Sequence, residues 1–286
     1  ESAVAEFADT ERMIQTTEAL YGPYRWERYD LLILPPSFPF GGMENPRLSF
    51  ITPTVIVGDK SLVSLIAHEL AHSWSGNLVT NASWKDIWLN EGFTSYVENR
   101  VVEALLGVEQ AQMENVISQN GLKAEMQQLA ASDQLLVLPA LTGRDPDQAL
   151  TDVAYVKGQW FLMFLEQRFG REAFDAFLRS YFDHFAFQSI HSGQFVDYLR
   201  AELMAREPEA ISALELDAWL HEPGIPEFAV AATSARFAAV DVARSNFLNS
   251  KVTAAELPTT AWTTQEWVHF LEGLPSRMDG AQLVEL

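Results

Sequence analysis

Apolar residues recur at two different spacings in this chain, and the change between them divides it into parts. Residues 6–20 have helical spacing, with acidic residues between the apolar ones. Residues 29–34 form an apolar run that predicts a buried strand. Residues 48–56 predict a second strand, which Pro53 limits to a sheet edge or to a break. The proline-rich stretch 35–42 between them predicts a loop, so the amino-terminal part should contain a small sheet.

Beyond residue 56 the pattern is helical almost throughout. A helix capped by Asp59 or Ser61 should run to about Ser75 and end at Gly76. Further helices are predicted over 91–106, 109–130, 152–169, 171–185, 192–206, 210–221, 232–248 and 263–273.

The segment 223–230 contains two prolines and a glycine and predicts a linker. We therefore expect an α+β fold, predominantly α, in which residues 1–222 form one domain with a small mixed sheet and a helical lobe. Residues 231–286 should begin a second, helical domain.

Composition narrows the classes of function. The chain has 286 residues, of which 39 are acidic and 19 basic, so its formal net charge is −20. This charge argues against nucleic acid and against anionic membranes as partners. No apolar run approaches the ~18 residues of a membrane span, which favours a soluble protein of undetermined compartment. The absence of cysteine excludes disulfides, thiolate metal sites and a cysteine nucleophile.

The strongest chemical signal is the pentapeptide His68-Glu69-Leu70-Ala71-His72. On a helix, positions i and i+4 share one face, so the two imidazoles can bind one metal ion while Glu69 lies beside it. This arrangement is typical of zinc hydrolases. The other four histidines are not spaced as metal ligands, so we expect them to have surface or structural roles. They are His184, His191, His221 and His269.

A catalytic zinc ion needs a third protein ligand. Glu91 begins the next predicted helix, and the eighteen residues from 73 to 90 suffice to return that helix alongside the first. Taken alone, Glu91 would be a carboxylate that favours a helix amino terminus, but its spacing from the metal motif favours a ligand. Glu98, two turns on, is either a support for a ligand histidine or a solvated glutamate.

Two further motifs flank the metal motif. Gly41-Gly42-Met43-Glu44-Asn45 precedes it, and Tyr155-Val156-Lys157-Gly158 lies downstream. With Asn90-Glu91-Gly92, this combination resembles the gluzincin zinc aminopeptidases of the aminopeptidase N type, over about residues 1–225. Within that family, the leukotriene hydrolase and aminopeptidase B branch is the most similar. The segments that carry this similarity are residues 35–39, 72–74 and 76–80.

The resemblance implies a thermolysin-like catalytic domain with one Zn²⁺ held by His68, His72 and Glu91. It implies that Glu69 is the general base for a zinc-activated water and that Tyr155 stabilises the oxyanion. From the residues alone, Tyr155 would be a core aromatic on a helix. The loop of Gly41, Gly42, Met43 and Glu44 is implied to bind substrate, with Glu44 on the free α-amino group.

One departure from that branch concerns epoxide hydrolysis. The branch uses an aspartate and a second tyrosine for this reaction. Asp147 matches the aspartate, whereas Leu150 stands at the tyrosine position. We therefore predict peptidase activity alone. Asp147 either lines the substrate pocket or belongs to the turn around Pro146.

The predicted activity is zinc-dependent removal of the first residue from peptides with a free amino terminus, with basic first residues as a candidate class. The alternatives are a zinc-binding fragment that is inactive alone, a bifunctional epoxide hydrolase and aminopeptidase, and a zinc endopeptidase, which the Glu44 loop disfavours. The family also carries further amino- and carboxy-terminal domains, so their counterparts in a longer protein are expected partners.

Overall fold

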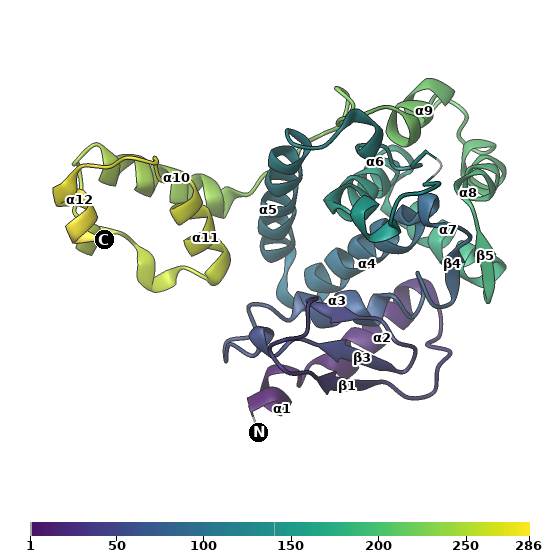
Figure 1. Ribbon diagram of the computed structural model, residues 1–286, viewed down its shortest axis with the longest axis horizontal. Coiled ribbons are helices and arrows are strands. Elements are labelled where there is room, and N and C mark those ends of the chain that lie inside the picture. The colour runs from purple at the N-terminus through teal and green to yellow at the C-terminus, as the bar shows by residue number, and fades with distance from the viewer. Residues whose placement is uncertain (1, 140) are drawn as a thin grey trace.

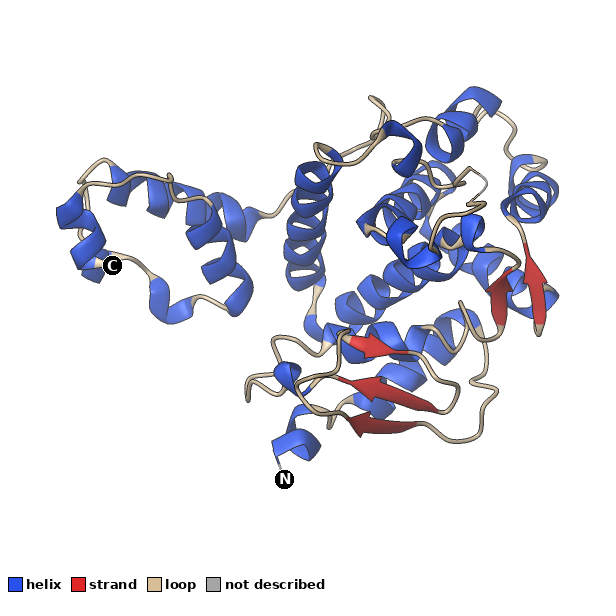
Figure 2. Cartoon of the chain, viewed as in Figure 1, coloured by secondary structure: helices blue, strands red, loops and turns tan. Residues whose placement is uncertain are grey.

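The computed structural model describes residues 2–139 and 141–286. Helices make up most of the chain and strands form two small sheets, which confirms the predicted α+β, predominantly α, class (Figure 2). The helices of the larger part are α1 (Ser2–Glu6), α2 (Thr10–Tyr21), α3 (Ser64–Ala71), α4 (Trp88–Leu106), α5 (Val108–Met126), α6 (Gly158–Phe169), α7 (Arg171–His184), α8 (Ser192–Leu199) and α9 (Ala213–His221). Two π-helical segments, Val153–Lys157 and Arg200–Met204, adjoin α6 and α8.

The larger sheet has three strands in the order β1-β3-β2. β1 (Asp30–Ile33) runs parallel to β3 (Leu48–Ile51), and β2 (Gly42–Met43) pairs antiparallel with its other edge. The second predicted strand is therefore central rather than at an edge, and of the two alternatives for Pro53 the structure shows the break. β3 ends before Pro53, which begins a 3₁₀ turn, so the missing proline amide falls outside the ladder.

The helix α3, which carries the metal motif, is shorter than the predicted 59–75. A left-handed backbone at Lys60, with φ of 60°, precludes a helix through that position. After His72 the amides of Ser73 and Trp74 bond three residues back, which tightens the last turn and ends the helix. The motif histidines therefore occupy the end of the helix, where the chain turns away.

The second sheet was not predicted. It consists of β4 (Val79–Asn81) and β5 (Gln188–Ile190), which pair in parallel. Strands of three residues are too short to show a period-2 pattern. β4 follows the turn after α3, so this pairing fixes the chain that runs from the metal motif towards α4.

The helix α4 lies in the middle of the larger part, packed against α3, α5 and α6 (Figure 1). Its apolar side chains are buried on several faces, including Trp88, Phe93 and Val97. Such a helix has no single apolar stripe because neighbours cover it all round. The central position of α4 holds Glu91 rigidly against α3.

The carboxy-terminal residues form a separate small helical group, seen in yellow-green in Figure 1. Its helices are α10 (Ala235–Leu248), α11 (Thr264–Glu272) and α12 (Gly280–Glu285), of which α12 was not predicted. α10 and α11 share a core of Val240, Phe247 and Phe270, to which Leu257 from the segment between them adds. The division at 222 and 231 stays a prediction. Among the described residues, no helix has both the length and the apolarity to cross a membrane.

Candidate active site

A cleft of about 1140 Å³ lies between α3, α4, β2 and the π-helical segment before α6. Its described lining residues include no lysine or arginine. The carboxylates that line it are Glu44, Glu69, Glu91, Glu98, Glu125, Asp147 and Asp152. This concentration of acidic groups attracts cations.

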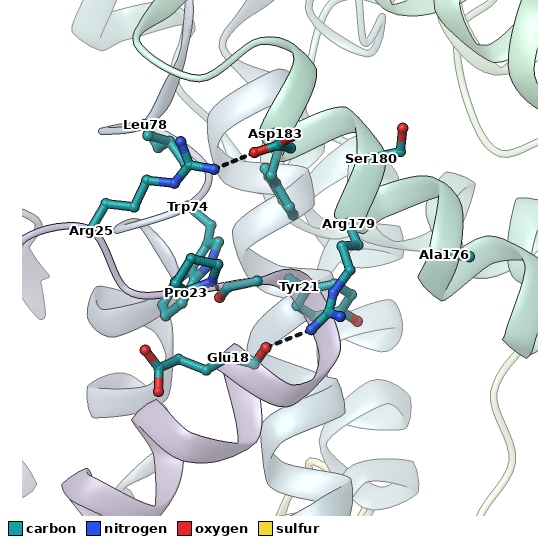
Figure 3. A pocket seen from close by; sticks show the side chains of 12 residues that line it. Glu18, Tyr21, Pro23, Arg25, Trp74, Leu78, Ala176, Arg179, Ser180 and Asp183 are labelled. Carbon is teal, nitrogen blue, oxygen red and sulfur yellow. Dashed lines mark hydrogen bonds and ion pairs between the residues drawn. The ribbon is translucent and has the colours of Figure 1, made fainter.

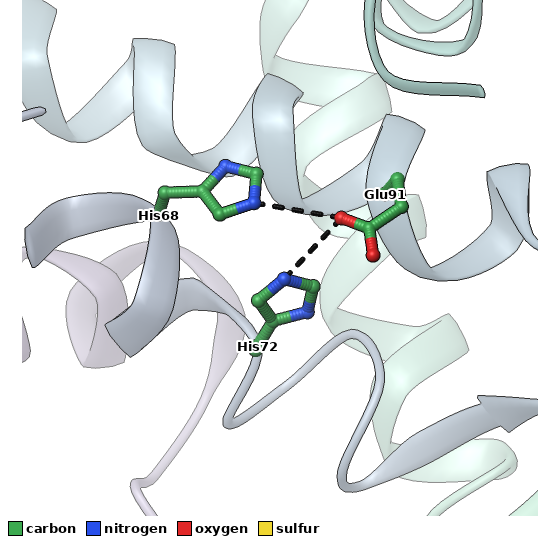
Figure 4. Close-up of side chains that lie close together, drawn as sticks. All are labelled: His68, His72 and Glu91. Carbon is green, nitrogen blue, oxygen red and sulfur yellow. Dashed lines mark ion pairs between the residues drawn. The ribbon is translucent and has the colours of Figure 1, made fainter. Parts of the chain in front are cut away.

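His68 on α3 and His72, the residue that follows this helix, lie one turn apart with ring centroids 4.8 Å apart, and both turn an Nε2 atom towards Glu91 (Figure 4). Oε2 of Glu91 lies 3.5 Å from Nε2 of His68 and 3.3 Å from Nε2 of His72. The predicted third ligand therefore meets the two histidines on neighbouring helices.

These three side chains fit a tetrahedral metal ion. Oε2 of Glu91 is buried and lacks a hydrogen-bond partner among the described residues, so it is a free ligand atom. Atoms bound tetrahedrally at ~2.0–2.1 Å from one zinc ion would lie about 3.3–3.4 Å apart, close to the two observed distances. Two imidazoles and one carboxylate are also a donor set that zinc hydrolases use.

The remaining ring nitrogens are engaged behind the site. Nδ1 of His72 lies 2.8 Å from the Ser75 carbonyl and 3.1 Å from the Thr94 hydroxyl. Because the carbonyl only accepts, Nδ1 must carry the hydrogen, which leaves Nε2 free to bind metal. Nδ1 of His68 lies 2.9 Å from Oε2 of Glu98, the geometry of a support for a ligand histidine.

Charge coupling within the cluster changes the pKa of each group. Burial alone would lower the pKa of His72, but Glu91 and Glu44 outweigh it and raise that pKa to about 9. Burial also lowers the pKa of His68, but the neighbouring carboxylates outweigh this effect and raise that pKa well above its usual value. Burial raises and the two imidazoles lower the pKa of Glu91, to about 2. A metal ion would compete with these imidazole protons, so its binding weakens as pH falls.

Glu69 lies beside the donor set on α3 and is buried. Burial raises the pKa of its carboxyl to about 7, against the lowering effect of the two histidines. Its Oε2 atom has no hydrogen-bond partner among the described residues. A buried carboxyl that titrates near neutrality can both accept and return a proton.

The loop before β3 brings three of the predicted substrate-binding residues to the same space. Gly41, Gly42 and Met43 line the cleft. A Cβ atom at Gly42 would lie 2.1 Å from Oε1 of Glu69, so this backbone passes directly over that carboxylate.

Glu44 ends that loop and also lines the cleft. Its Oε1 atom lies 4.0 Å from Nδ1 of His72, and its carbonyl accepts a hydrogen bond from the Asn77 side chain at 2.9 Å. The loop thus places a second carboxylate beside the donor set.

Tyr155 lines the same cleft, next to His68. Its ring stacks on His68, with centroids 6.0 Å apart and an angle of 27° between the planes. Burial and the nearby Glu91, Glu44 and Glu69 raise the pKa of its hydroxyl, which therefore stays protonated and can donate a hydrogen bond. It lies in the π-helical segment, where a backbone bulge re-aims side chains.

Asp147 and Leu150 both line the cleft. Asp147 is exposed, in a 3₁₀ turn whose start is capped by the Asp145 side chain. The turn and the pocket interpretations of Asp147 therefore both describe its position. The four histidines outside the motif lie away from the cleft.

A second hollow, of about 620 Å³, lies between α2 and α7 (Figure 3). Its two arginines are already engaged, Arg25 with Asp183 and Arg179 with the carbonyls of Glu18 and Ala19. None of the metal-ligand clusters among the described residues lies there.

A family model described as the peptidase family M1 domain matches residues 5–219. The chain belongs to peptidase family M1. This match confirms the resemblance and covers the zinc motif, the Glu44 loop and Tyr155.

Known M1 relatives match the same region. Leucine aminopeptidase 2 of Yarrowia lipolytica is 46% identical over 229 residues, which is 77% of this chain and 35% of that protein. Leukotriene A-4 hydrolase of Xenopus laevis is 45% identical over 228 residues, 79% of this chain and 37% of that protein. The chain thus spans little more than a third of the length of these relatives.

Solved M1 structures agree in fold. The structure of yeast LTA4 hydrolase in complex with bestatin matches with a TM-score of 0.88 and 33% identity, over 98% of this chain and 47% of that one. An M1 zinc metallopeptidase mutant from Deinococcus radiodurans, bound to a Tyr-Ser-Ala substrate, matches with a TM-score of 0.61 and 25% identity, over 77% of this chain and 45% of that one.

Sequence reasoning missed Thr94 as a partner of the M1 metal motif. Thr94 lies three residues after Glu91, on the same helix face, and its hydroxyl bonds the Ser75 carbonyl at 2.9 Å. This i+3 spacing from a predicted ligand was the available signal.

Proposed function

We propose that this chain is the catalytic region of a zinc-dependent aminopeptidase that removes the first residue from peptides. The observation that carries the proposal is the convergence of His68, His72 and Glu91 with the carboxylates of Glu69 and Glu44 on one cleft. Membership of family M1 and the likeness to aminopeptidases support it.

His68, His72 and Glu91 would hold the zinc ion. When bound, zinc supplies a Lewis acid for a carbonyl oxygen and lowers the pKa of a coordinated water to about 7. The hydrogen bonds of the two Nδ1 atoms keep both Nε2 atoms directed at the shared space.

Glu69 acts as the general base and then as the acid. With a pKa of about 7, its carboxylate accepts a proton from the attacking water and returns it to the leaving amine. Tyr155 donates its hydroxyl hydrogen to the oxygen on which negative charge develops, because its raised pKa keeps that hydrogen in place.

Glu44 binds the substrate's free ammonium group. Glu44 lines the cleft and its Oε1 atom lies 4.0 Å from Nδ1 of His72, so an ammonium group bound there would be held close to the metal ligands. A charge-assisted hydrogen bond of this kind fixes register as well as affinity. This position favours an exopeptidase over an endopeptidase.

Leu150 favours a peptidase without epoxide hydrolase activity. A leucine side chain lines the cleft at the position where the related branch carries a tyrosine, and it offers no hydroxyl group. The acidic lining favours peptides with a basic first residue. Domains corresponding to the unmatched parts of the relatives are the proposed partners of the region.

The test uses the complete natural protein, with zinc content and hydrolysis of aminoacyl arylamides as the readouts. Glu69→Gln should retain zinc and lose ~10²–10⁴ in kcat. Glu109→Gln, an exposed glutamate on α5, is the matched control and should equal the wild type. Unchanged turnover in Glu69→Gln would refute the assigned base.

The alternative of an inactive zinc-binding fragment is tested on residues 1–286 alone. Zinc binding without turnover in this fragment, with turnover in the complete protein, would support that alternative. Equal specific rates would show that the cleft is sufficient by itself.

A further inference from the structure

Lys157 is a buried cation that the mechanism above does not use. Its side chain is among the largest that are fully buried, at 0% exposure. None of the ion pairs between described residues includes it. Burial lowers the pKa of its ammonium group to about 8, so the charged form still predominates at neutral pH. A buried charge of this kind needs compensating hydrogen bonds.

Two backbone carbonyls supply those bonds. Nζ of Lys157 donates to the carbonyl of Gln134 at 2.9 Å and to that of Glu222 at 2.7 Å. The acceptors come from separate segments, one after α5 and one at the end of α9. These segments are also joined to each other, because the amide of Val137 bonds the carbonyl of Leu220 at 3.0 Å.

The Gln134 segment is itself anchored. The Gln134 side chain donates to the carbonyls of Met126 and Leu129, both at 3.0 Å, and so caps the end of α5. Lys157 therefore bonds a segment that is itself held in place, and this contact fixes the position of the segment that carries Lys157.

Lys157 is also the last residue of the π-helical segment that carries Tyr155. In a helical turn, residues two apart project to opposite sides. Tyr155 accordingly lines the cleft, and Lys157 points to the buried side behind it. The next residue, Gly158, packs against α4, where a Cβ atom would lie 2.7 Å from Cα of Gly92. The turn is thus held by backbone contact beside Glu91 and by the ammonium group.

We propose that Lys157 is a positioning residue for Tyr155: its ammonium group, held by the carbonyls of Gln134 and Glu222, fixes the turn that presents the tyrosine hydroxyl to the cleft. This inference rests on the proposed oxyanion role of Tyr155. Because Glu222 begins the segment that leads to α10, the bond from Lys157 also connects the turn that carries Tyr155 to the start of that segment.

The test is a double-mutant cycle in the complete natural protein, with Lys157→Met, Tyr155→Phe and the double variant. Lys157→Met should lower kcat by ~10- to 100-fold, since a small misplacement of a catalytic group has an effect of this size. KM should stay within about twofold and zinc content should be unchanged. In the Tyr155→Phe background the lysine change should cost less than about twofold, because no hydroxyl is left to position.

Equal loss in both backgrounds would overturn the proposal, and so would loss of zinc or an effect confined to KM. Lys123→Met is the matched control, because Lys123 lies over the Trp160 ring of α6 and outside the cleft. It should equal the wild type in kcat and KM.

If Lys157→Met does not fold, Lys157→Arg gives the same test, since it keeps the charge and the donors. It should lower kcat by a smaller factor, and only when Tyr155 is present. An equal loss with and without Tyr155 would again overturn the proposal. Full activity of Tyr155→Phe itself would instead refute the proposed function of the tyrosine, so the two failures are distinguishable.

Discussion

The two walls of the cleft are held in place by different means. On one wall, His68, His72 and Glu91 lie on α3 and α4, and each histidine has a second partner behind the site. On the other wall, Asp147 and Tyr155 lie in a 3₁₀ turn and a π-helical segment. The first wall owes its geometry to regular helices, whereas the turn that carries Tyr155 depends on the contacts of Lys157 with distant segments.

This difference implies that the walls respond differently to substitution. Changes behind the helical wall should act on metal affinity, because they loosen the ligands. Changes on the irregular wall should act on kcat or on substrate choice, because its groups meet the substrate and leave the metal donors intact. The following predictions test that division.

Of the three substitutions that test this division, the one at Tyr155 should have the largest effect. Tyr155→Phe removes the proposed hydrogen-bond donor to the developing oxyanion and should lower kcat by ~10²–10³. Zinc affinity should stay at the wild-type value, because the proposed ligands are His68, His72 and Glu91 and the substitution leaves all three in place. Steady-state kinetics with parallel zinc titration measures both quantities, and a loss of zinc would contradict the division between the walls.

A smaller effect is expected at Glu98, behind the helical wall. Glu98→Gln replaces the carboxylate at 2.9 Å from Nδ1 of His68 and should weaken zinc binding by ~10–100-fold. With zinc in excess, most of the turnover should return. Competition with a metal chelator measures the zinc affinity. An unchanged zinc affinity would show that Glu98 does not support the ligand His68.

The smallest effect is expected at the exposed Asp147. Asp147→Asn should lower kcat/KM for arginyl arylamides by up to about fivefold, the range of an exposed ion pair. Alanyl arylamides should be hydrolysed as by the wild type. The difference should disappear at high salt, because screening removes it. If the difference between Asp147→Asn and the wild type does not change with ionic strength, a charge contact between Asp147 and the substrate is contradicted.

The helical wall was predictable from the sequence because its signals are local. A four-residue histidine spacing and a glutamate at the next helix start predict the meeting of three donors. The central position of β3 and the β4–β5 pair both depend on pairing between segments that are separate in the sequence. The spacing of apolar residues within one segment gives no information on such pairing. The carbonyls that hold Lys157 lie 23 and 65 residues away, and backbone acceptors leave no residue signature.

Recognition of the free amino terminus by Glu44 is most directly tested by one ratio: kcat/KM for a free aminoacyl arylamide over that for its N-acetylated form. In the complete natural protein this ratio should be about 10² or more, since acetylation removes the charge that Glu44 is proposed to bind. In Glu44→Gln this ratio should be smaller than in the wild type. A ratio near one in the wild type would contradict the aminopeptidase assignment.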